Sequence, residues 1–434
     1  MGQPIIRLFR QLIKPKGEIY LKIKKQQNKK NYYLLLSAVF LGFLIFGFSE
    51  KIKGPAIPRM QADFSLNEMQ VGTLLALNSL GYLLACSFTG FLIKKVGIRN
   101  SSFMAFISMA VAGVFIFLSV NYPTLSASYF LMYLGNGMLE IALGVLAARV
   151  FTKNTGTMMN LSHFFYGLSS TLAPIFATVL MRMNISGKNI GWHGMYLIML
   201  SLSLIPIIPA IFAKFPGDDI KEEERLPMKE YIRDPAAWII VIILSLGVIS
   251  ELSVGGWLVN FLEKAYKWDV TTASGLLSGF FLAFTLARLL LGPITDKIGF
   301  TKSLIIFSGA AGLLTIAGII IGEPGALLFA LAGAGIAPIY PTVMALIAKR
   351  YPKNSDTAIS FTVTLMGIGS VIGNFLVGTI IDLFKNIFTK NLGAEVGIII
   401  GMKAGYAFIG GCALLSCDAS FILYFYLNKR KQLI

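Results

Sequence analysis

Long apolar runs recur along this chain and decide what it can fold into. Each run is about 20 residues long, and a helix of that length crosses roughly 30 Å of hydrocarbon. Inside a bilayer the backbone must satisfy its own hydrogen bonds, so such runs predict membrane-spanning helices. The chain is therefore expected to be an all-α integral membrane protein with twelve transmembrane helices. The runs cover about residues 32–57, 69–93, 101–120, 124–149, 157–181, 194–214, 236–262, 271–293, 303–322, 326–348, 357–384 and 404–427.

The charge balance favours lipid over nucleic acid as the surroundings. Charged residues make up only 14% of the 434 residues, whereas soluble proteins carry roughly 25%. A net charge of +17 would suggest nucleic acid in a soluble protein. Here 27 of the 38 basic residues fall in the termini and in the loops on the same side, and ten fall on the other side. Because cytoplasmic loops are rich in Lys and Arg, we expect both termini in the cytoplasm, a plasma-membrane location and no nucleic-acid partner.

The segments outside the runs divide the chain. Residues 1–31 lack the apolar stretch and cleavage site of a signal peptide, and they fit either a basic amphipathic helix on the membrane surface or a disordered tail. Residues 215–235 combine charges and prolines, as linkers do. We expect bundles over 32–214 and 236–427 and a second short tail over 428–434. The three cysteines all lie within predicted spans, so neither a disulfide framework nor a metal or cofactor site is expected.

Four short motifs recur about 200 residues apart and in the same order. Ser49-Glu50 with Gly54 returns as Ser250-Glu251 with Gly255. The other pairs are Gly90-x-x-x-Lys94-Lys95-x-Gly97 with Gly292-x-x-x-Asp296-Lys297-x-Gly299, Gly135-x-Gly137 with Gly333-x-Gly335, and Gly167 with Gly367. The nearly constant offset predicts two pseudo-symmetric six-helix bundles of the same orientation. Parallel repeats of this kind build transporters whose site lies between the repeats, near the middle of the membrane.

The Gly-x-x-x-Asp-Lys-x-Gly loop and its counterpart resemble the signature of the major facilitator superfamily, and the resemblance covers residues 32–427. Within that superfamily the chain is similar to the fucose permease type of sugar:proton symporters. The stretches that carry this similarity are residues 135–140, 160–167, 251–257 and 338–342, together with the Lys-Lys pair of the first loop. The resemblance implies the two-bundle fold, alternating access, and a sugar moved together with a proton.

Three carboxylates within the runs are candidates for proton coupling, because ionisable groups at membrane depth are costly and are usually functional. Glu140 lies about 16 residues into the fourth run, past the middle of the membrane, and the resemblance implies that it is the proton carrier. Glu50 and Glu251 occupy equivalent outer positions in the two repeats. The resembled family has its span-1 carboxylate where this chain has Gly54, one turn after Glu50. Glu50 also precedes Lys51 and Lys53, so a solvated ion cluster is the alternative.

Polar and aromatic residues on the inward-facing runs are candidates for substrate binding. Asn160, His163 and Tyr166 share one face of the fifth run, where amide, imidazole and ring suit a hydroxylated solute. Hydrogen bonding between helices is the alternative role. The resembled family has amides where this chain has His163 and Tyr166. The further candidates are Asn136, Tyr340, Asn374, Asn78, and Trp257, whose ring fits either a sugar face or an interfacial belt.

Four residues are expected to gate the cytoplasmic side. Arg288, near the end of the eighth run, is expected to pair there with a carboxylate or a helix C-terminus. Asp296 in the second loop copy is expected to accept hydrogen bonds from the N-terminus of a neighbouring helix. Lys94 replaces it in the first copy, next to Lys95, and cannot do this.

We expect a monomeric secondary transporter that imports a small polar solute, a sugar, with a coupling ion that is a proton or sodium. Proton-driven export of drugs or metabolites on the same fold is the main alternative. The chain has no Gly-x-x-x-x-Gly-Lys-Ser/Thr motif, which argues against ATP-driven transport. It has only two histidines and no metal-ligand cluster, which argues against an enzyme. A sensor without transport activity would need an output domain, and none is recognisable.

Overall fold

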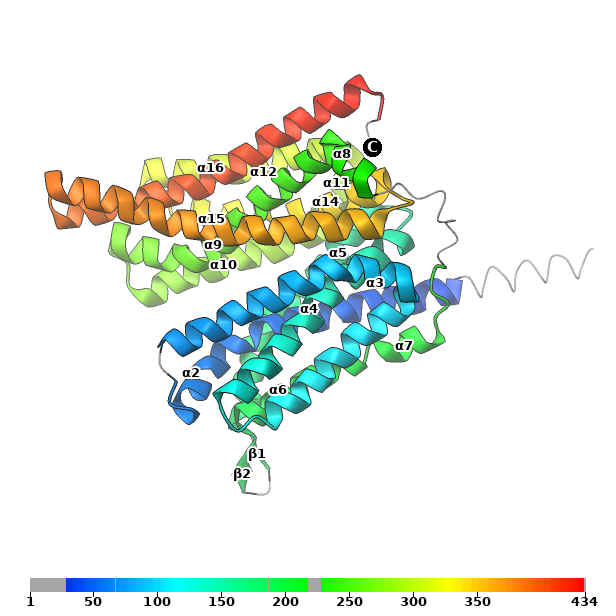
Figure 1. The fold of residues 1–434 in the computed structure, drawn as a ribbon. Coiled ribbons are helices and arrows are strands. Elements are labelled where there is room, and N and C mark those ends of the chain that lie inside the picture. Colours follow the sequence, from blue (N-terminus) through cyan, green and yellow to red (C-terminus); the bar gives the residue numbers. More distant parts are fainter. Residues whose placement is uncertain (1–28, 67, 186, 218–227, 433–434) are drawn as a thin grey trace, which may run out of the picture.

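The computed structural model describes residues 29–66, 68–185, 187–217 and 228–432. These residues form helices and one small hairpin (Figure 1). The predicted basic tail over residues 1–31, whether an amphipathic helix or disordered, lies outside the described residues except for its last three positions, as does the middle of the predicted linker. We call residues 29–217 the N-terminal half and residues 228–432 the C-terminal half.

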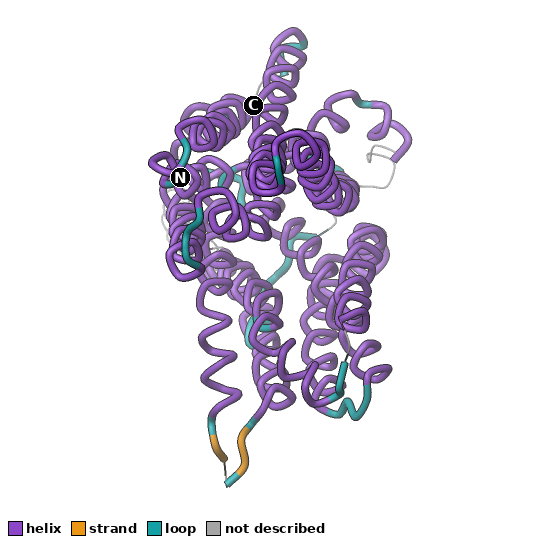
Figure 2. Tube along the Cα trace, turned by 90° about the vertical axis from the view of Figure 1, so that its left-hand side faces the viewer, coloured by secondary structure: helices purple, strands orange, loops and turns teal. Residues whose placement is uncertain are grey.

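The N-terminal half begins with a helix over residues 29–51. The helices that follow are α2 (Lys53–Asp63), α3 (Glu68–Phe117), α4 (Tyr122–Val150), α5 (Thr155–Arg182), α6 (Gly191–Ser201), the 3-10 turn η1 (Leu202–Leu204) and α7 (Ile207–Phe212). Between α5 and α6, β1 (Asn184–Ile185) pairs antiparallel with β2 (Lys188–Asn189), with Asn184 opposite Asn189. Figure 2 shows this hairpin projecting away from the helices.

The C-terminal half begins with the short helix α8 (Met228–Arg233), within the predicted linker. The long helices are α9 (Pro235–Tyr266), α10 (Val270–Leu290), α12 (Phe300–Ile321), α15 (Ser355–Leu392) and α16 (Ala394–Lys429). The shorter elements are α11 (Gly292–Ile298), the 3-10 turn η3 (Glu323–Gly325), α13 (Leu327–Ile336) and α14 (Ile339–Arg350).

In the described part of the chain, ten helices are long and apolar enough to cross a membrane, and α10 with α11, bent by 51°, makes an eleventh. The helix α3 counts once, although its backbone breaks at Gly97 (φ 83°) and the chain folds back there (Figure 1). With its two arms counted separately, each of the twelve predicted runs corresponds to a helical segment. Gly299 (φ 92°) makes the equivalent turn in the second repeat. A backbone of this kind suits glycine because a Cβ would be strained there, which explains the last glycine of both loop motifs.

The sequence predicts helix starts well where a cap is present. Asn121 and Thr124 form a capping box at the start of α4, and a proline follows in the first turn. Asp234 caps α9 by accepting from the backbone N–H of Ala236, again with a proline in the first turn. Both helices begin within two residues of the predicted runs.

The segment between the last two predicted runs is a correction. Residues 385–403, with three lysines and three glycines, were expected to be a loop, but α15 continues to Leu392 and α16 begins at Ala394. Gly393, with φ 90°, is the whole turn. Glycines four residues apart on α16 explain the difference, because a Cβ on Gly401 would meet the Ile381 carbonyl oxygen at 2.6 Å. Their absent side chains let α16 lie directly against α15, and this packing extends both helices.

The two halves meet along helices that occupy equivalent places in the repeat. The helix α5 packs against α10, α11 and α14 of the other half, and α15 packs against α3 and α4. The helix over residues 29–51 begins, and α16 ends, at the same end of the molecule, which we call the terminal side (Figure 1). Large apolar side chains face outward, such as Ile320 (78% exposed) and Phe375 (72% exposed). An apolar exterior of this kind is what lipid requires.

Candidate functional site

A cavity of about 530 Å³ lies between the two halves. Its wall comes from the first helix, α2, α3, α4 and α5 of one half and from α9, α10, α14 and α15 of the other. The ionisable side chains that line it are Glu50, Lys53, Glu140, His163, Glu251 and Arg288. All three predicted coupling carboxylates therefore face one space.

Glu140 joins the two halves. Its carboxylate accepts hydrogen bonds from the hydroxyl of Tyr82 on α3 and from the hydroxyl of Tyr340 on α14. The side chain of Glu140 is buried, at 8% exposure. Tyr82 comes this close because a Cβ on Gly137 would meet the Tyr82 carbonyl oxygen at 2.5 Å, so only glycine lets α3 lie against α4 here. The predicted candidates Glu140 and Tyr340 are thus direct partners.

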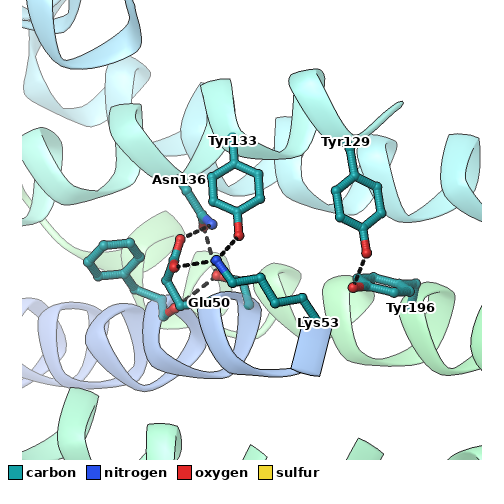
Figure 3. Close-up of polar contacts among 8 residues, drawn as sticks. Glu50, Lys53, Tyr129, Tyr133, Asn136 and Tyr196 are labelled. Atoms are coloured by element: carbon teal, nitrogen blue, oxygen red, sulfur yellow. Dashed lines mark hydrogen bonds and ion pairs between the residues drawn. The ribbon is translucent and has the colours of Figure 1, made fainter. Parts of the chain in front are cut away.

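Glu50 belongs to a network within the N-terminal half (Figure 3). One carboxylate oxygen accepts from Asn136 Nδ2 at 3.0 Å, and the other lies 3.4 Å from Lys53 Nζ. Lys53 also donates to the Tyr133 hydroxyl at 2.6 Å, and Ser49 Oγ donates to Asn136 Oδ1 at 2.7 Å. The ion pair with Lys53 matches the alternative of an ion cluster, but both charges line the cavity. Asn136 is fully buried behind Glu50 and holds its carboxylate in place.

Glu251 and Arg288 form the charged pair of the C-terminal half. Arg288 Nη2 lies 3.8 Å from a Glu251 carboxylate oxygen, while Nε donates to the Ala337 carbonyl at 3.1 Å and Nη1 to the His163 carbonyl at 3.4 Å. The Ala337 carbonyl needs such a donor because its helical partner would be the N–H of residue 341, which is a proline. The guanidinium also lies 4.2 Å from the centre of the Phe284 ring.

The position of Arg288 differs from the expected one. The sequence places it at the cytoplasmic gate, close to the end of the eighth run, but in the structure it lines the central cavity. The reason is that α11 continues this span to Ile298, ten residues beyond Arg288. At 1.5 Å per residue, about 15 Å of helix separates it from the end of the span.

The second loop copy makes several of the contacts that close the terminal side. Asp296 accepts from the backbone N–H groups of Gly156 and Thr157, each at 2.7 Å, and from the Thr157 hydroxyl at 2.6 Å. These are the predicted hydrogen bonds to a helix N-terminus, here that of α5. Gly292 of the same motif lies against Thr157, whose Cα would be 2.8 Å from an added Cβ.

The first loop copy contributes differently to the same closure. Lys94 and Lys95 are exposed, while Gly90 lies against Ser360 of α15, whose Cβ would be 2.8 Å from an added Cβ. Nearby, Lys349 Nζ donates to the Thr152 carbonyl at 2.7 Å and so links the two halves. The gating roles of Arg288, Asp296, Lys94 and Lys95 stay predictions.

Two of the three residues on the predicted polar face of α5 line the cavity. His163 contacts Phe43 and Tyr340, with ring centres 4.8 and 4.9 Å apart, and Tyr166 contacts Phe46. Asn160 does not line it. One turn nearer the terminal side, it is fully buried where the halves touch, and its Nδ2 donates to the Gly156 carbonyl at 2.9 Å.

The remaining candidates separate in the same way. Asn78 lines the cavity, whereas Trp257 packs near Gly378 on α15 and is not among the lining residues. Asn374 is on α15, but its side chain lies outside the described residues. Among the lining residues that were not candidates are Lys53, Tyr82 and Tyr133. Lys53 could have been found from its position three residues after Glu50, whereas the two tyrosines depend on how α3 and α4 lie, which no local pattern shows. The described residues hold no group of three or more metal-ligating side chains.

Comparison with known proteins identifies the family to which the chain belongs. A sequence profile of the Major Facilitator Superfamily matches residues 39–373 and 246–432. A protein named TsgA homolog from Buchnera aphidicola is 21% identical over 373 residues, which is 84% of this chain and 94% of that protein. A glucose/galactose transporter of Brucella abortus is 23% identical over 255 residues, 54% of this chain and 60% of that protein.

Solved structures agree in fold. The fucose:proton symporter of E. coli superimposes with a TM-score of 0.71 at 16% identity, covering 89% of this chain and 99% of that one. A proton:xylose symporter superimposes with a TM-score of 0.69 at 13% identity, covering 90% and 95%. At these identities the likeness concerns the arrangement of the helices.

Proposed function

The chain belongs to the Major Facilitator Superfamily of secondary transporters, and we propose that it imports a small sugar together with a proton, by alternating access. The observation that carries this proposal is the position of Glu140 in the cavity wall, bonded by one tyrosine hydroxyl from each half. An ionised carboxylate accepts from both hydroxyls, whereas a protonated one has a hydrogen of its own to place. Loading and releasing a proton at Glu140 therefore changes a contact between the halves that must separate during transport.

The cavity supports a polar solute of modest size. Aromatic rings and hydrogen-bonding groups share its wall, including His163, Tyr166 and Tyr340, and this mixture suits a sugar, which has apolar faces and polar edges. We assign these three residues to substrate binding. Glu50 and Glu251 would take part in coupling or hold the solute, with Asn136 positioning Glu50. The relatives named as sugar transporters support the same substrate class.

The conformational state that we propose rests on the closed terminal side. Asp296 and Lys349 hold the halves together there, and the cavity lies beyond these contacts. The excess of basic residues on the same side favours a cytoplasmic location for it in the plasma membrane. We therefore take the structure as an outward-facing state of a monomer, ready to accept solute and proton from outside.

The test is uptake by purified protein in liposomes under an imposed pH gradient. Labelled glucose, galactose, fucose and xylose would be offered separately, with a sodium gradient in place of the proton gradient as the second arm. One proton moved inward at 100 mV supplies about 2.3 kcal/mol, or nearly fiftyfold accumulation. We expect Glu140→Gln to abolish this accumulation and to retain exchange of labelled for unlabelled sugar.

The matched control is Glu230→Gln, on the exposed surface of α8, which should accumulate sugar like the parent. If Glu140→Gln accumulates sugar as well as the parent does, Glu140 is not the coupling site. If no sugar is taken up and a lipophilic cation is expelled instead, the protein is an exporter. Accumulation driven by the sodium gradient alone would mean that sodium, and not the proton, is the coupling ion.

A further inference from the structure

Asn78 stands apart from the other polar residues of the cavity. It lies on α3 and is 3% exposed, and neither Nδ2 nor Oδ1 of its amide has a hydrogen-bond partner. Within the described residues, it is the one cavity-lining side chain with buried polar atoms left in this state. Each such atom costs about 1–3 kcal/mol when it stays unpaired. Because Asn78 lines the cavity, a ligand that reaches its amide and bonds to it offsets that cost.

Other buried asparagines show what a structural amide does in this protein. Asn136 bonds to Glu50 through Nδ2 and to Ser49 through Oδ1. Asn160 bonds to the main chain of its own helix through Nδ2, and only its Oδ1 has no partner. Both reach a neighbour that the fold supplies. Asn78 makes neither kind of bond, so its amide is not what holds α3 in place.

The charged groups of the cavity are already engaged with one another. Lys53 lies against Glu50, and Arg288 faces Glu251 and two main-chain carbonyls. Glu140 accepts from two tyrosines. The neutral amide is left over, and it offers one donor group beside one acceptor. Its natural partner is a neutral group that can accept and donate side by side, as two neighbouring hydroxyls of a sugar do.

We propose that Asn78 is a specificity-determining residue that recognises a pair of adjacent hydroxyl groups on the transported solute. The inference rests on the proposed sugar transport and specifies which part of the sugar Asn78 recognises. Tyr82, the partner of Glu140, lies four residues further on the same face of α3. A solute held by Asn78 is thus one helical turn from the proton site.

The test compares binding and stability in Asn78→Leu, with Asn386→Leu on the exposed surface of α15 as the matched control. The probes are galactose, its four monodeoxy derivatives, glucose, fucose, xylose and inositol, scored by the shift in the thermal unfolding midpoint and by titration calorimetry. Wild-type protein should bind galactose about 10–100-fold more tightly than two deoxy derivatives that lack neighbouring hydroxyls. The affinity of Asn78→Leu for galactose should fall by the same factor, so that the variant binds these two derivatives as tightly as it binds galactose.

The unfolding midpoint without sugar separates recognition from a structural role. Replacing an unpaired buried amide by an apolar side chain of similar size should leave this midpoint unchanged or raise it. A variant that binds galactose with the wild-type profile overturns the inference while sugar transport stands. A lowered midpoint without sugar also overturns it, because Asn78 would then support the fold. If no probe binds wild-type protein, the sugar proposal fails and takes this inference with it.

Discussion

The two halves carry matching motifs but use them differently at the terminal side. In the second loop copy Asp296 accepts three hydrogen bonds from the start of α5. In the first copy Lys94 stands in its place and is exposed, so the corresponding contact is made by the close approach of Gly90 to α15. The contact between the second loop copy and α5 thus consists of hydrogen bonds, whereas the contact between the first copy and α15 consists of close packing. The repeat thus preserves where the halves touch but not how.

The charged pairs of the cavity show a second difference. Glu50 and Lys53 are 3.4 Å apart with side-chain exposures of 17% and 29%, whereas Glu251 and Arg288 are 3.8 Å apart with exposures of 20% and 3%. The distance changes the Coulomb energy by only about a tenth. Burial of the cation matters more, because an unpaired charge costs most where water cannot reach it. Disrupting the Glu251–Arg288 pair should therefore lower the free energy of unfolding more than disrupting the Glu50–Lys53 pair, although its two charges lie further apart.

The strongest test of the closure compares Asp296→Ala with Lys94→Ala. Losing three hydrogen bonds to a carboxylate should weaken the closure by about 3 kcal/mol, which shifts the equilibrium between closed and open terminal side on the order of 100-fold. Lys94→Ala should shift it little. Spin labels on cysteines introduced at the exposed Lys153 and Lys302 would report the distance between the halves. Equal widening in both variants would mean that the two copies contribute alike.

Neutralising one carboxylate at a time tests the comparison of the charged pairs. Glu251→Gln should lower the free energy of unfolding by about 2–3 kcal/mol, because it leaves Arg288 buried beside no carboxylate. Glu50→Gln should lower it by about 1 kcal/mol or less, because Lys53 is partly exposed and keeps its bond to Tyr133. Thermal unfolding in detergent gives both values. The reverse order would show that distance, and not burial, governs these pairs.

The two tyrosines that hold Glu140 allow a test with a smaller effect. Tyr340→Phe removes a hydrogen bond between the halves, whereas Tyr82→Phe removes one within the N-terminal half. A bond of this kind contributes about 1 kcal/mol, so Tyr340→Phe should shift the closed-to-open ratio about fivefold. Tyr82→Phe should leave the ratio close to that of the parent. The same spin-label pair measures both, and equal shifts would argue against a bridging role for Tyr340.

The smallest expected effect concerns how each half holds its first long helix at the terminal side. Asn31 does so with a neutral amide on the main chain of Lys214. Asp234 does so with a carboxylate: burial acts to raise its pKa, but hydrogen bonds from Tyr351, the Ala236 N–H and Arg350 outweigh this and hold the pKa below its usual value.

A lowered pKa stabilises the folded state above the unfolded pKa of about 3.9, and this stabilisation disappears as the pH falls through the folded value. The difference in unfolding midpoint between wild type and Asp234→Asn should therefore be constant near neutral pH and shrink below about pH 4. It should correspond to under 1 kcal/mol, since Asp234 is partly exposed. Asn31→Ala should lower the stability of the protein by the same amount at every pH. A difference for Asp234→Asn that does not change with pH would mean that its charge is not involved.

Much of the fold could be predicted because hydrophobic runs, caps and glycine turns are local features. The start of α9 at Pro235 and the turn at Gly97 follow directly from such patterns. The long continuation of α15 and α16 could not, because it depends on glycines that matter only once the two helices lie together. The carboxylates of the site stood out because charges are rare in these spans. Tyr82 and Tyr133 did not, since one tyrosine among sixteen has no visible partner until α3 and α4 are packed.

The cavity has one more consequence, which concerns water. A space of about 530 Å³ holds roughly 18 water molecules at about 30 Å³ each. In an alternating cycle this space must close on one side and open on the other, so each turnover releases and takes up a comparable volume of solvent. The balance between the two states depends on the activity of water to the extent that one state holds more water than the other. An osmolyte too large to enter should favour whichever state holds less water, and the transporter should respond to osmotic pressure even when neither sugar nor pH changes.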